Sequence, residues 1–158
     1  MKQLFQFVFL LFFYGTITAQ QTGYVDFKSL HATLSVDTDS LMVYGGVVVK
    51  FEILKDVDSI FIDAIDMEFD FYGDANEGIK FSYDNKKLWL ISDFKSDKEY
   101  VVLFNYKAQP KKALYFVNKN EDWQIWTQGQ GKYTSNWLPS IDDVNDKIQF
   151  AFKVVYDK

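Results

Sequence analysis

Few residues in this chain have the types and spacing needed for chemistry. His31 is the single histidine, and there is no cysteine. A zinc hydrolase of the His-Glu-x-x-His type needs two imidazoles on one helical face, and a Ser-His-Asp triad needs a nucleophile elbow, which the chain lacks. His31 alternates with Leu30 and Ala32, so we interpret it as a strand residue. The sequence therefore offers no catalytic residue and no zinc site.

Two acidic segments could hold a cation. Asp142, Asp143 and Asp146 lie within five residues; they could bind a metal ion, or they could cap a short turn by accepting hydrogen bonds from free backbone N–H groups. The segment from Asp37 to Ser40 resembles the start of a calcium loop. It lacks the glycine of such loops at the sixth position and has Val48 in place of the glutamate at the twelfth, so we interpret it as a turn between strands.

Tryptophans suggest a different chemistry, the stacking of sugar rings. Aromatic residues make up 19% of the chain, and an alternative hypothesis is a secreted carbohydrate-binding β-sandwich. A stacking platform needs rings on one exposed face, whereas Trp123 and Trp126, three residues apart, would point to opposite faces of a strand. The candidates are Trp89, Trp123, Trp126 and Trp137.

Charge and composition exclude one class of partner. The formal net charge is −5, the pI is about 4.8, and all 17 basic residues are lysines. Nucleic-acid binding needs a basic surface, so we expect no nucleic-acid partner. Without arginine, the chain also has no bidentate clamp for carboxylates or phosphates.

The N-terminus is typical of a secretory signal. Lys2 precedes an apolar run from Leu4 to Gly15, and Ala19 lies before a polar junction, as in signal peptides. We predict a signal peptide over residues 1–19 and export to the periplasm, the cell surface or the exterior. The run is shorter than the roughly 20 residues of a membrane span, so we expect no span in the mature chain.

The rest of the chain, residues 20–158, reads as a single all-β domain. Apolar residues alternate with polar ones in many short segments separated by turns, which predicts an antiparallel, saddle-like β-sandwich. The alternation changes phase between Ala64 and Ile65, which indicates a bulge or corner, and Tyr72 to Gly78 is typical of a turn. The predicted strands include 47–53, 60–64, 65–71, 79–83, 87–92, 99–108, 113–118 and 148–156.

One segment has a spacing that is found in a known family. Trp126, Thr127 and Gln128 are followed by Pro139, then Asp142, and then Lys147 at the start of a strand. This segment resembles the N-terminal β domain of the aminopeptidase N family, peptidase family M1. The chain departs from the family pattern at residues 135–137, where many members have an arginine, and at Val144, where many have a proline.

The resemblance implies the function of a larger protein. Members of the family are zinc aminopeptidases whose Gly-x-Met-x-Asn and His-Glu-x-x-His motifs lie in a downstream catalytic domain. This chain has neither motif, so the resemblance implies a non-catalytic β domain, truncated at its C-terminus. Its partners would be the catalytic domain, which would hold the zinc, and the N-terminus of a peptide substrate. By the resemblance, Gln128 is the residue that reaches the cleft and binds that N-terminus.

Overall fold

The computed structural model describes residues 21–75, 78–120 and 122–156. The predicted signal peptide, residues 1–19, lies outside the described residues. Strands dominate, with two short 3₁₀ turns, η1 (Gln21–Gly23) and η2 (Thr134–Asn136). The strands are β1 (Val25–Asp37), β2 (Met42–Ile53), β3 (Val57–Asp63), β4 (Met67–Asp74), β5 (Lys80–Tyr83), β6 (Lys87–Phe94), β7 (Lys98–Ala108), β8 (Leu114–Lys119), β9 (Asp122–Thr127) and β10 (Gln149–Val155).

A curved five-stranded sheet, which we call sheet A, forms the floor of the molecule. Its strand order is β10-β1-β2-β7-β4. The neighbouring strands are antiparallel, with one exception, because β10 runs parallel to β1 with Leu30 opposite Phe150. The predicted antiparallel β-sandwich is thus found in the other strand pairs, and this edge departs from it. Parallel neighbours cannot be joined by a short hairpin, and here the chain from residue 38 to residue 148, with β2 to β9, separates β1 from β10.

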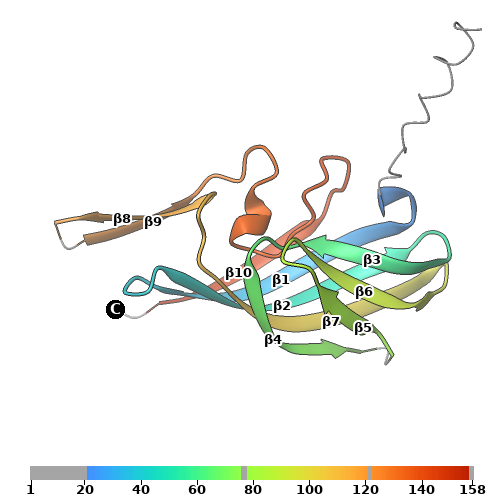
Figure 1. The fold of residues 1–158 in the computed structure, drawn as a ribbon. Coiled ribbons are helices and arrows are strands. Elements are labelled where there is room, and N and C mark those ends of the chain that lie inside the picture. The colour runs from blue at the N-terminus through green and yellow to red at the C-terminus, as the bar shows by residue number, and fades with distance from the viewer. Residues whose placement is uncertain (1–20, 76–77, 121, 157–158) are drawn as a thin grey trace, which may run out of the picture.

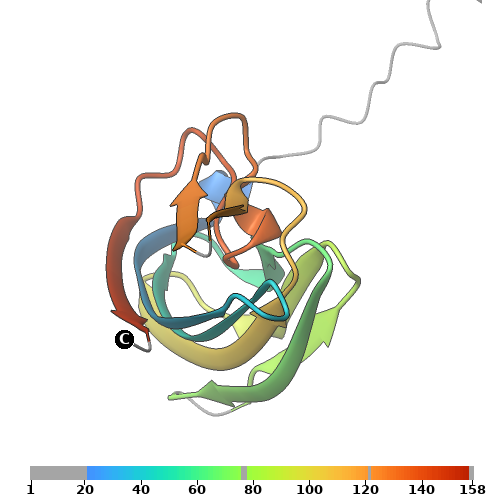
Figure 2. The same ribbon diagram turned by 90° about the vertical axis from the view of Figure 1, so that its left-hand side faces the viewer.

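Sheet B and a hairpin complete the saddle-like shape (Figures 1 and 2). Sheet B has the order β3-β6-β5, and β8 pairs with β9 in a separate hairpin that projects from one end of the molecule (Figure 1). The all-β fold is confirmed. The predicted corner is also present, because the chain leaves sheet B after Asp63 and enters sheet A at Met67. The predicted turn at Tyr72 begins too early, since β4 continues to Asp74.

The core is built from the strand alternation that the sequence shows. In β2, Val47, Val49, Phe51 and Ile53 are at most 1% exposed. Phe51 stacks on Tyr100 with ring centroids 5.6 Å apart and meets Phe94 edge-on at 5.9 Å. Such ring pairs add about 0.5–1.5 kcal/mol beyond their buried area, and the pair of Phe51 with Phe94 of β6 joins sheet A to sheet B.

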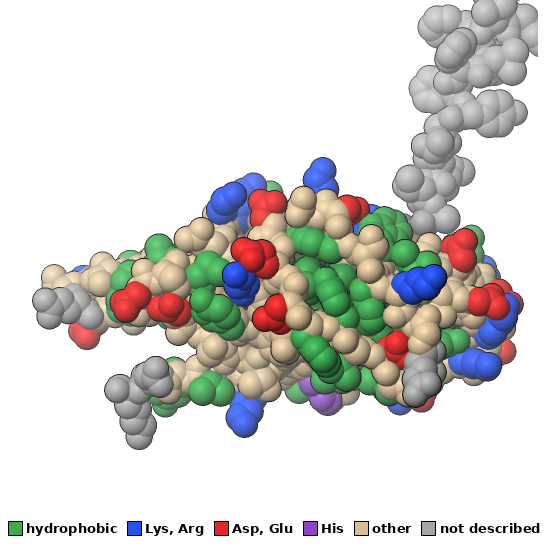
Figure 3. Space-filling view, turned by 60° about the horizontal axis from the view of Figure 1, so that its bottom comes forward, with side chains coloured by type: hydrophobic (Ala, Val, Ile, Leu, Met, Phe, Trp, Pro, Cys, Tyr) green, Lys and Arg blue, Asp and Glu red, His purple; other side chains and the backbone are tan. Residues whose placement is uncertain are grey.

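The surface mixes charges of both signs. On the face shown in Figure 3, lysine and acidic side chains lie interspersed with hydrophobic ones. Exposed ion pairs such as Lys107–Glu68, at 2.9 Å, contribute little to stability in water. Within the described ranges, no helix is long and apolar enough to cross a membrane.

Candidate functional site

Gln128 lies at the end of the projecting hairpin. It follows β9 directly, and its backbone N–H donates a 2.8 Å hydrogen bond to the carbonyl of Ala113, just before β8. The residue is exposed, and among the described residues its side-chain amide has no hydrogen-bond partner. The hairpin therefore fixes the backbone of Gln128 and leaves its amide free to bind another molecule.

The neighbouring tryptophans lie on opposite faces of β9, as the sequence predicts. Trp126 stacks on Tyr115 of β8 with centroids 4.4 Å apart. Trp123 points to the other side of the hairpin, where it lines a groove together with Ile125 and Thr127. Trp137 is 8% exposed. These rings do not form one flat platform, which argues against the carbohydrate hypothesis.

The segment after Gln128 crosses back over the molecule and is anchored to both sheets, to Tyr106 of sheet A and to Asp63 of sheet B. Trp137 N and Leu138 N both donate to the carbonyl of Thr134, at 3.1 Å, which closes η2. The phenol of Tyr106, on β7, donates a 2.8 Å hydrogen bond to the carbonyl of Trp137. Pro139 is buried just beyond this point. The irregular segment is thus held by tertiary hydrogen bonds instead of a strand ladder.

Asp142 helps to hold this segment in place through two hydrogen bonds. Asp63 and Ser140 form an isolated bridge, with backbone hydrogen bonds of 2.8 and 2.9 Å. The N–H of Asp142 donates to the Asp63 carboxylate at 3.0 Å, and Ser140 Oγ donates to the Asp142 carboxylate at 2.9 Å. Burial raises the pKa of Asp63, and the hydrogen bond from Asp142 offsets part of this rise. The role of Asp142 here is structural.

Asp143 and Asp146 follow in a tight turn. The Asp143 carboxylate accepts hydrogen bonds from Asn145 N, at 3.0 Å, and from its side-chain amide, at 3.2 Å. Burial, helped by the nearby charge of Asp26, raises the pKa of Asp146 to about 6. Among the described residues, no group of three acidic, histidine or cysteine side chains could hold a metal ion. The Asp143 carboxylate therefore caps this turn, as in the capping alternative, whereas the Asp146 carboxylate accepts a backbone hydrogen bond from Phe27 of β1 and its Oδ2 has no partner among the described residues.

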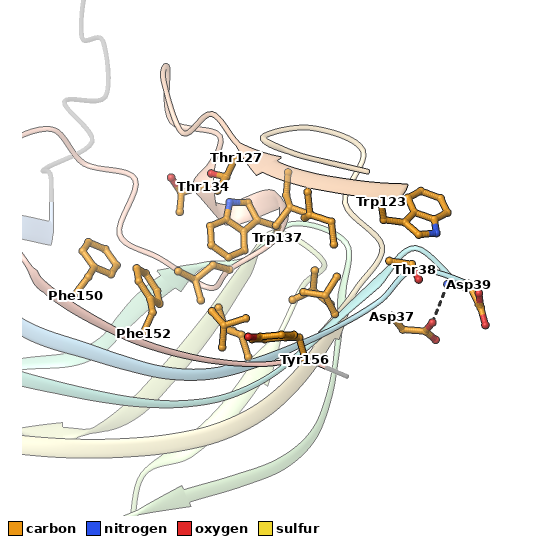
Figure 4. Close-up of a pocket in the computed structure, with 17 residues that line it drawn as sticks. Asp37, Thr38, Asp39, Trp123, Thr127, Thr134, Trp137, Phe150, Phe152 and Tyr156 are labelled. Carbon is orange, nitrogen blue, oxygen red and sulfur yellow. Dashed lines mark hydrogen bonds between the residues drawn. The ribbon is translucent and has the colours of Figure 1, made fainter. Parts of the chain in front are cut away.

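An apolar groove of about 1010 Å³ lies between sheet A and the hairpin. Phe150 and Phe152 of β10 stack at 5.8 Å on its floor, and Trp137 lies 6.5 Å from Phe152 (Figure 4). Asp37 and Asp39 are the charged residues among its lining, and the Asp37 carboxylate accepts a hydrogen bond from Asp39 N at 2.9 Å. Gln128 is outside this lining. The turn predicted at Asp37 to Ser40 is confirmed between β1 and β2.

Comparisons with known proteins agree on one family. The match to the Peptidase M1 N-terminal domain family covers residues 26–158. The chain therefore belongs to this family. A search of curated proteins by sequence finds no match.

Solved structures share the fold at low sequence identity. An M1 zinc metallopeptidase from Deinococcus radiodurans superimposes with a TM-score of 0.71 at 13% identity, covering 84% of this chain and 32% of that one. A two-domain M1 zinc metallopeptidase mutant bound to L-tryptophan gives a TM-score of 0.72 at 12% identity, covering 84% and 33%. Native leukotriene A4 hydrolase from Saccharomyces cerevisiae gives 0.70 at 14% identity, covering 84% and 23%. The chain thus spans a third or less of the length of these relatives.

The sequence pointed to the loop that holds Gln128, but it did not predict the apolar groove between sheet A and the hairpin. The structure places Gln128 at an exposed corner of the hairpin, with its backbone held by Ala113. The groove joins residues from β1, β9, η2 and β10. The row of large apolar residues along β10 is the one local sequence feature that contributes to the groove. By itself this pattern predicts only a strand.

Proposed function

We propose that this chain is the non-catalytic N-terminal part of an exported zinc aminopeptidase. In the complete protein, the β domain covers the catalytic cleft, and Gln128 binds the N-terminal end of the peptide substrate. Zinc belongs to the catalytic domain, which lies in the same polypeptide in this family. The chain by itself then has no peptidase activity.

The observation that carries this proposal is the placement of Gln128. Its backbone is fixed by the 2.8 Å hydrogen bond to Ala113 O, whereas its amide has no partner among the described residues. A fixed backbone lowers the entropy that a bound ligand must remove. An amide both donates and accepts without titrating, so its carbonyl oxygen suits a substrate ammonium group over a wide pH range.

The test uses the longer M1 protein that contains this domain. We expect Gln128→Ala to lower kcat/KM for peptides with a free N-terminus by about 10- to 100-fold, as expected for the loss of a hydrogen bond to a charged group. Gln130→Ala, two residues further along the same exposed loop, is the matched control and should leave kcat/KM close to the wild-type value. Equal values for Gln128→Ala and the wild type would refute the contact.

Export forms a separate part of the proposal. Lys2, the apolar run from Leu4 to Gly15 and the junction after Ala19 support a cleaved signal. Expression of the full chain with its natural leader should yield exported protein whose first residue is Gln20, measured by intact mass and N-terminal sequencing. Retention of Met1 in a protein that remains inside the cell would contradict the proposed export, but not the proposed place of this domain in an aminopeptidase.

A further inference from the structure

The outer edge of β3 is closed by two contacts from distant parts of the chain. β3 pairs with β6 on its other side. At the outer edge, Asp63 exchanges two backbone hydrogen bonds with Ser140, of 2.8 and 2.9 Å. Two residues earlier, Phe61 O accepts a 2.9 Å hydrogen bond from the side-chain amide of Gln21, and Phe61 N donates to the oxygen of that amide at 3.0 Å. The Gln21 amide thus takes the place of a neighbouring strand and covers an edge that would otherwise be open to pairing.

The backbone around Gln21 is held as well. Its carbonyl accepts a 2.8 Å hydrogen bond from Tyr24 N, which closes the 3₁₀ turn η1. The Tyr24 carbonyl accepts a 2.7 Å hydrogen bond from Leu54 N, just after β2. Val25, the first residue of β1, is 1% exposed. η1 therefore lies fixed beside β3 (Figure 1), and Gln21 belongs to a turn and not to an extended segment.

The predicted cleavage site of the signal peptide lies directly before this turn. Cleavage is a hydrolysis, in which one water molecule adds across the bond between Ala19 and Gln20 and leaves a carboxylate and an amine. Gln21 is then the second residue beyond the cleaved bond. Peptides that bind by strand addition do so in an extended conformation, and a protease that binds its substrate in this way needs Gln21 extended. The folded η1 turn does not offer that conformation.

We propose that the signal peptide is removed before η1 closes on β3, and that Gln21 makes a folded chain with its signal peptide still attached resistant to the signal peptidase. This inference rests on the proposed export. Cleavage of the folded chain requires an opening that breaks both amide hydrogen bonds to Phe61, and its rate follows the population of the open form. Two hydrogen bonds of ordinary strength make that form about 10- to 100-fold rarer.

The first test compares cleavage before and after folding. The longer M1 protein that contains this domain is made with its signal peptide by cell-free translation without membranes. Signal peptidase in detergent is added either during synthesis or after folding. We expect complete cleavage of the wild type in the first case and a rate lower by about 10- to 100-fold in the second. Gln21→Ala should be cleaved rapidly in both cases, whereas Thr22→Ala, in the same turn, is the matched control and should behave as the wild type.

The second test examines the contact without the signal peptide. Hydrogen–deuterium exchange of the mature protein, followed by mass spectrometry, reports on the amides of β3. The β3 peptide should exchange about 10-fold faster in Gln21→Ala than in the wild type or Thr22→Ala, because Phe61 N loses its acceptor. Peptides from β2 should exchange as in the wild type. Thermal melts followed by circular dichroism check that both variants fold.

The outcomes separate this inference from the proposed export. A wild type that is cleaved as fast after folding as during synthesis would overturn the proposed order, as would unchanged exchange of β3 in Gln21→Ala. Cleavage during synthesis also shows that the peptidase still recognises each variant. Absence of cleavage under every condition would refute the export itself, and the order with it, while the exchange measurement would still decide whether Gln21 holds the edge of β3.

Discussion

The phenol of Tyr106 donates a 2.8 Å hydrogen bond to the backbone carbonyl of Trp137. This contact joins β7, in the middle of the chain, to the irregular segment that follows the hairpin. Tyr106 is only 3% exposed, and its burial raises the pKa of the phenol well above the ordinary value. The hydroxyl therefore stays protonated and remains a donor at neutral pH.

Removal of this hydroxyl should loosen the segment. We expect Tyr106→Phe to lower the free energy of unfolding by about 1–3 kcal/mol, because the buried Trp137 carbonyl loses its donor. Urea denaturation measures the change. Tyr100→Phe is the control, because it removes a hydroxyl that accepts a 3.2 Å hydrogen bond at an exposed site. It should lower the free energy of unfolding by less than Tyr106→Phe does. Equal losses would show that the Tyr106 contact is not special.

Gly45 allows the Tyr106 ring to occupy its position. A Cβ atom added at Gly45 would lie 2.2 Å from Tyr106 Cε1, whereas one added at the adjacent Gly46 would lie 3.2 Å from Asn105 Oδ1. Overpacking a buried site typically costs about 1–3 kcal/mol. Gly45→Ala should therefore lower the melting temperature clearly more than Gly46→Ala, measured by calorimetry. The reverse order would contradict the packing described here.

Asp146 should make stability depend on pH. Its folded-state pKa, about 6, lies above the ordinary 3.8, so the folded state binds the proton more tightly. The charged Asp146 carboxylate therefore lowers the stability of the fold above pH 6. This loss of stability disappears as the pH falls toward 4 and the carboxylate is protonated. Asp146→Asn should melt at a higher temperature than the wild type at pH 7 and at a similar temperature at pH 4.

Asp37 provides a control of opposite sign. Hydrogen bonds from Ser40 Oγ and Asp39 N lower the pKa of its carboxyl. The stability that it contributes is present above about pH 4 and is lost as the pH falls through its folded-state pKa. Asp37→Asn should therefore destabilise the protein at neutral pH. A rise in melting temperature for both variants at pH 7 would contradict this account.

Trp126 tests the carbohydrate hypothesis directly. Its stack on Tyr115, at 4.4 Å, lies on the exposed hairpin, so Trp126→Ala should cost about 0.5–1.5 kcal/mol and leave sheet A intact. Near-ultraviolet circular dichroism reports the loss of the stack. We expect neither the wild type nor the variant to bind polysaccharide columns. Retention of the wild type that is lost in the variant would instead support glycan binding.

Local patterns predicted most of the strands correctly. The hairpin at Ile79–Tyr83 and Lys87–Ser92 is β5 and β6, and the phase change at Ala64 is the corner between the sheets. These elements depend on side chains close together in sequence. β9 is not among the predicted strands, because its Thr127 pairs with Leu114, a partner that the local pattern does not identify.

The sequence by itself determined the all-β fold class, from the alternation of apolar residues, and pointed to the family, from the spacing of Trp126, Gln128 and Lys147. Only the tertiary structure decided the parallel pairing of β1 with β10, the closing of the β3 edge by Gln21 and Ser140, and the apolar groove. The physical reason is that these features join segments far apart along the chain. Alternation specifies which face of a strand is apolar, but not which strand lies beside it.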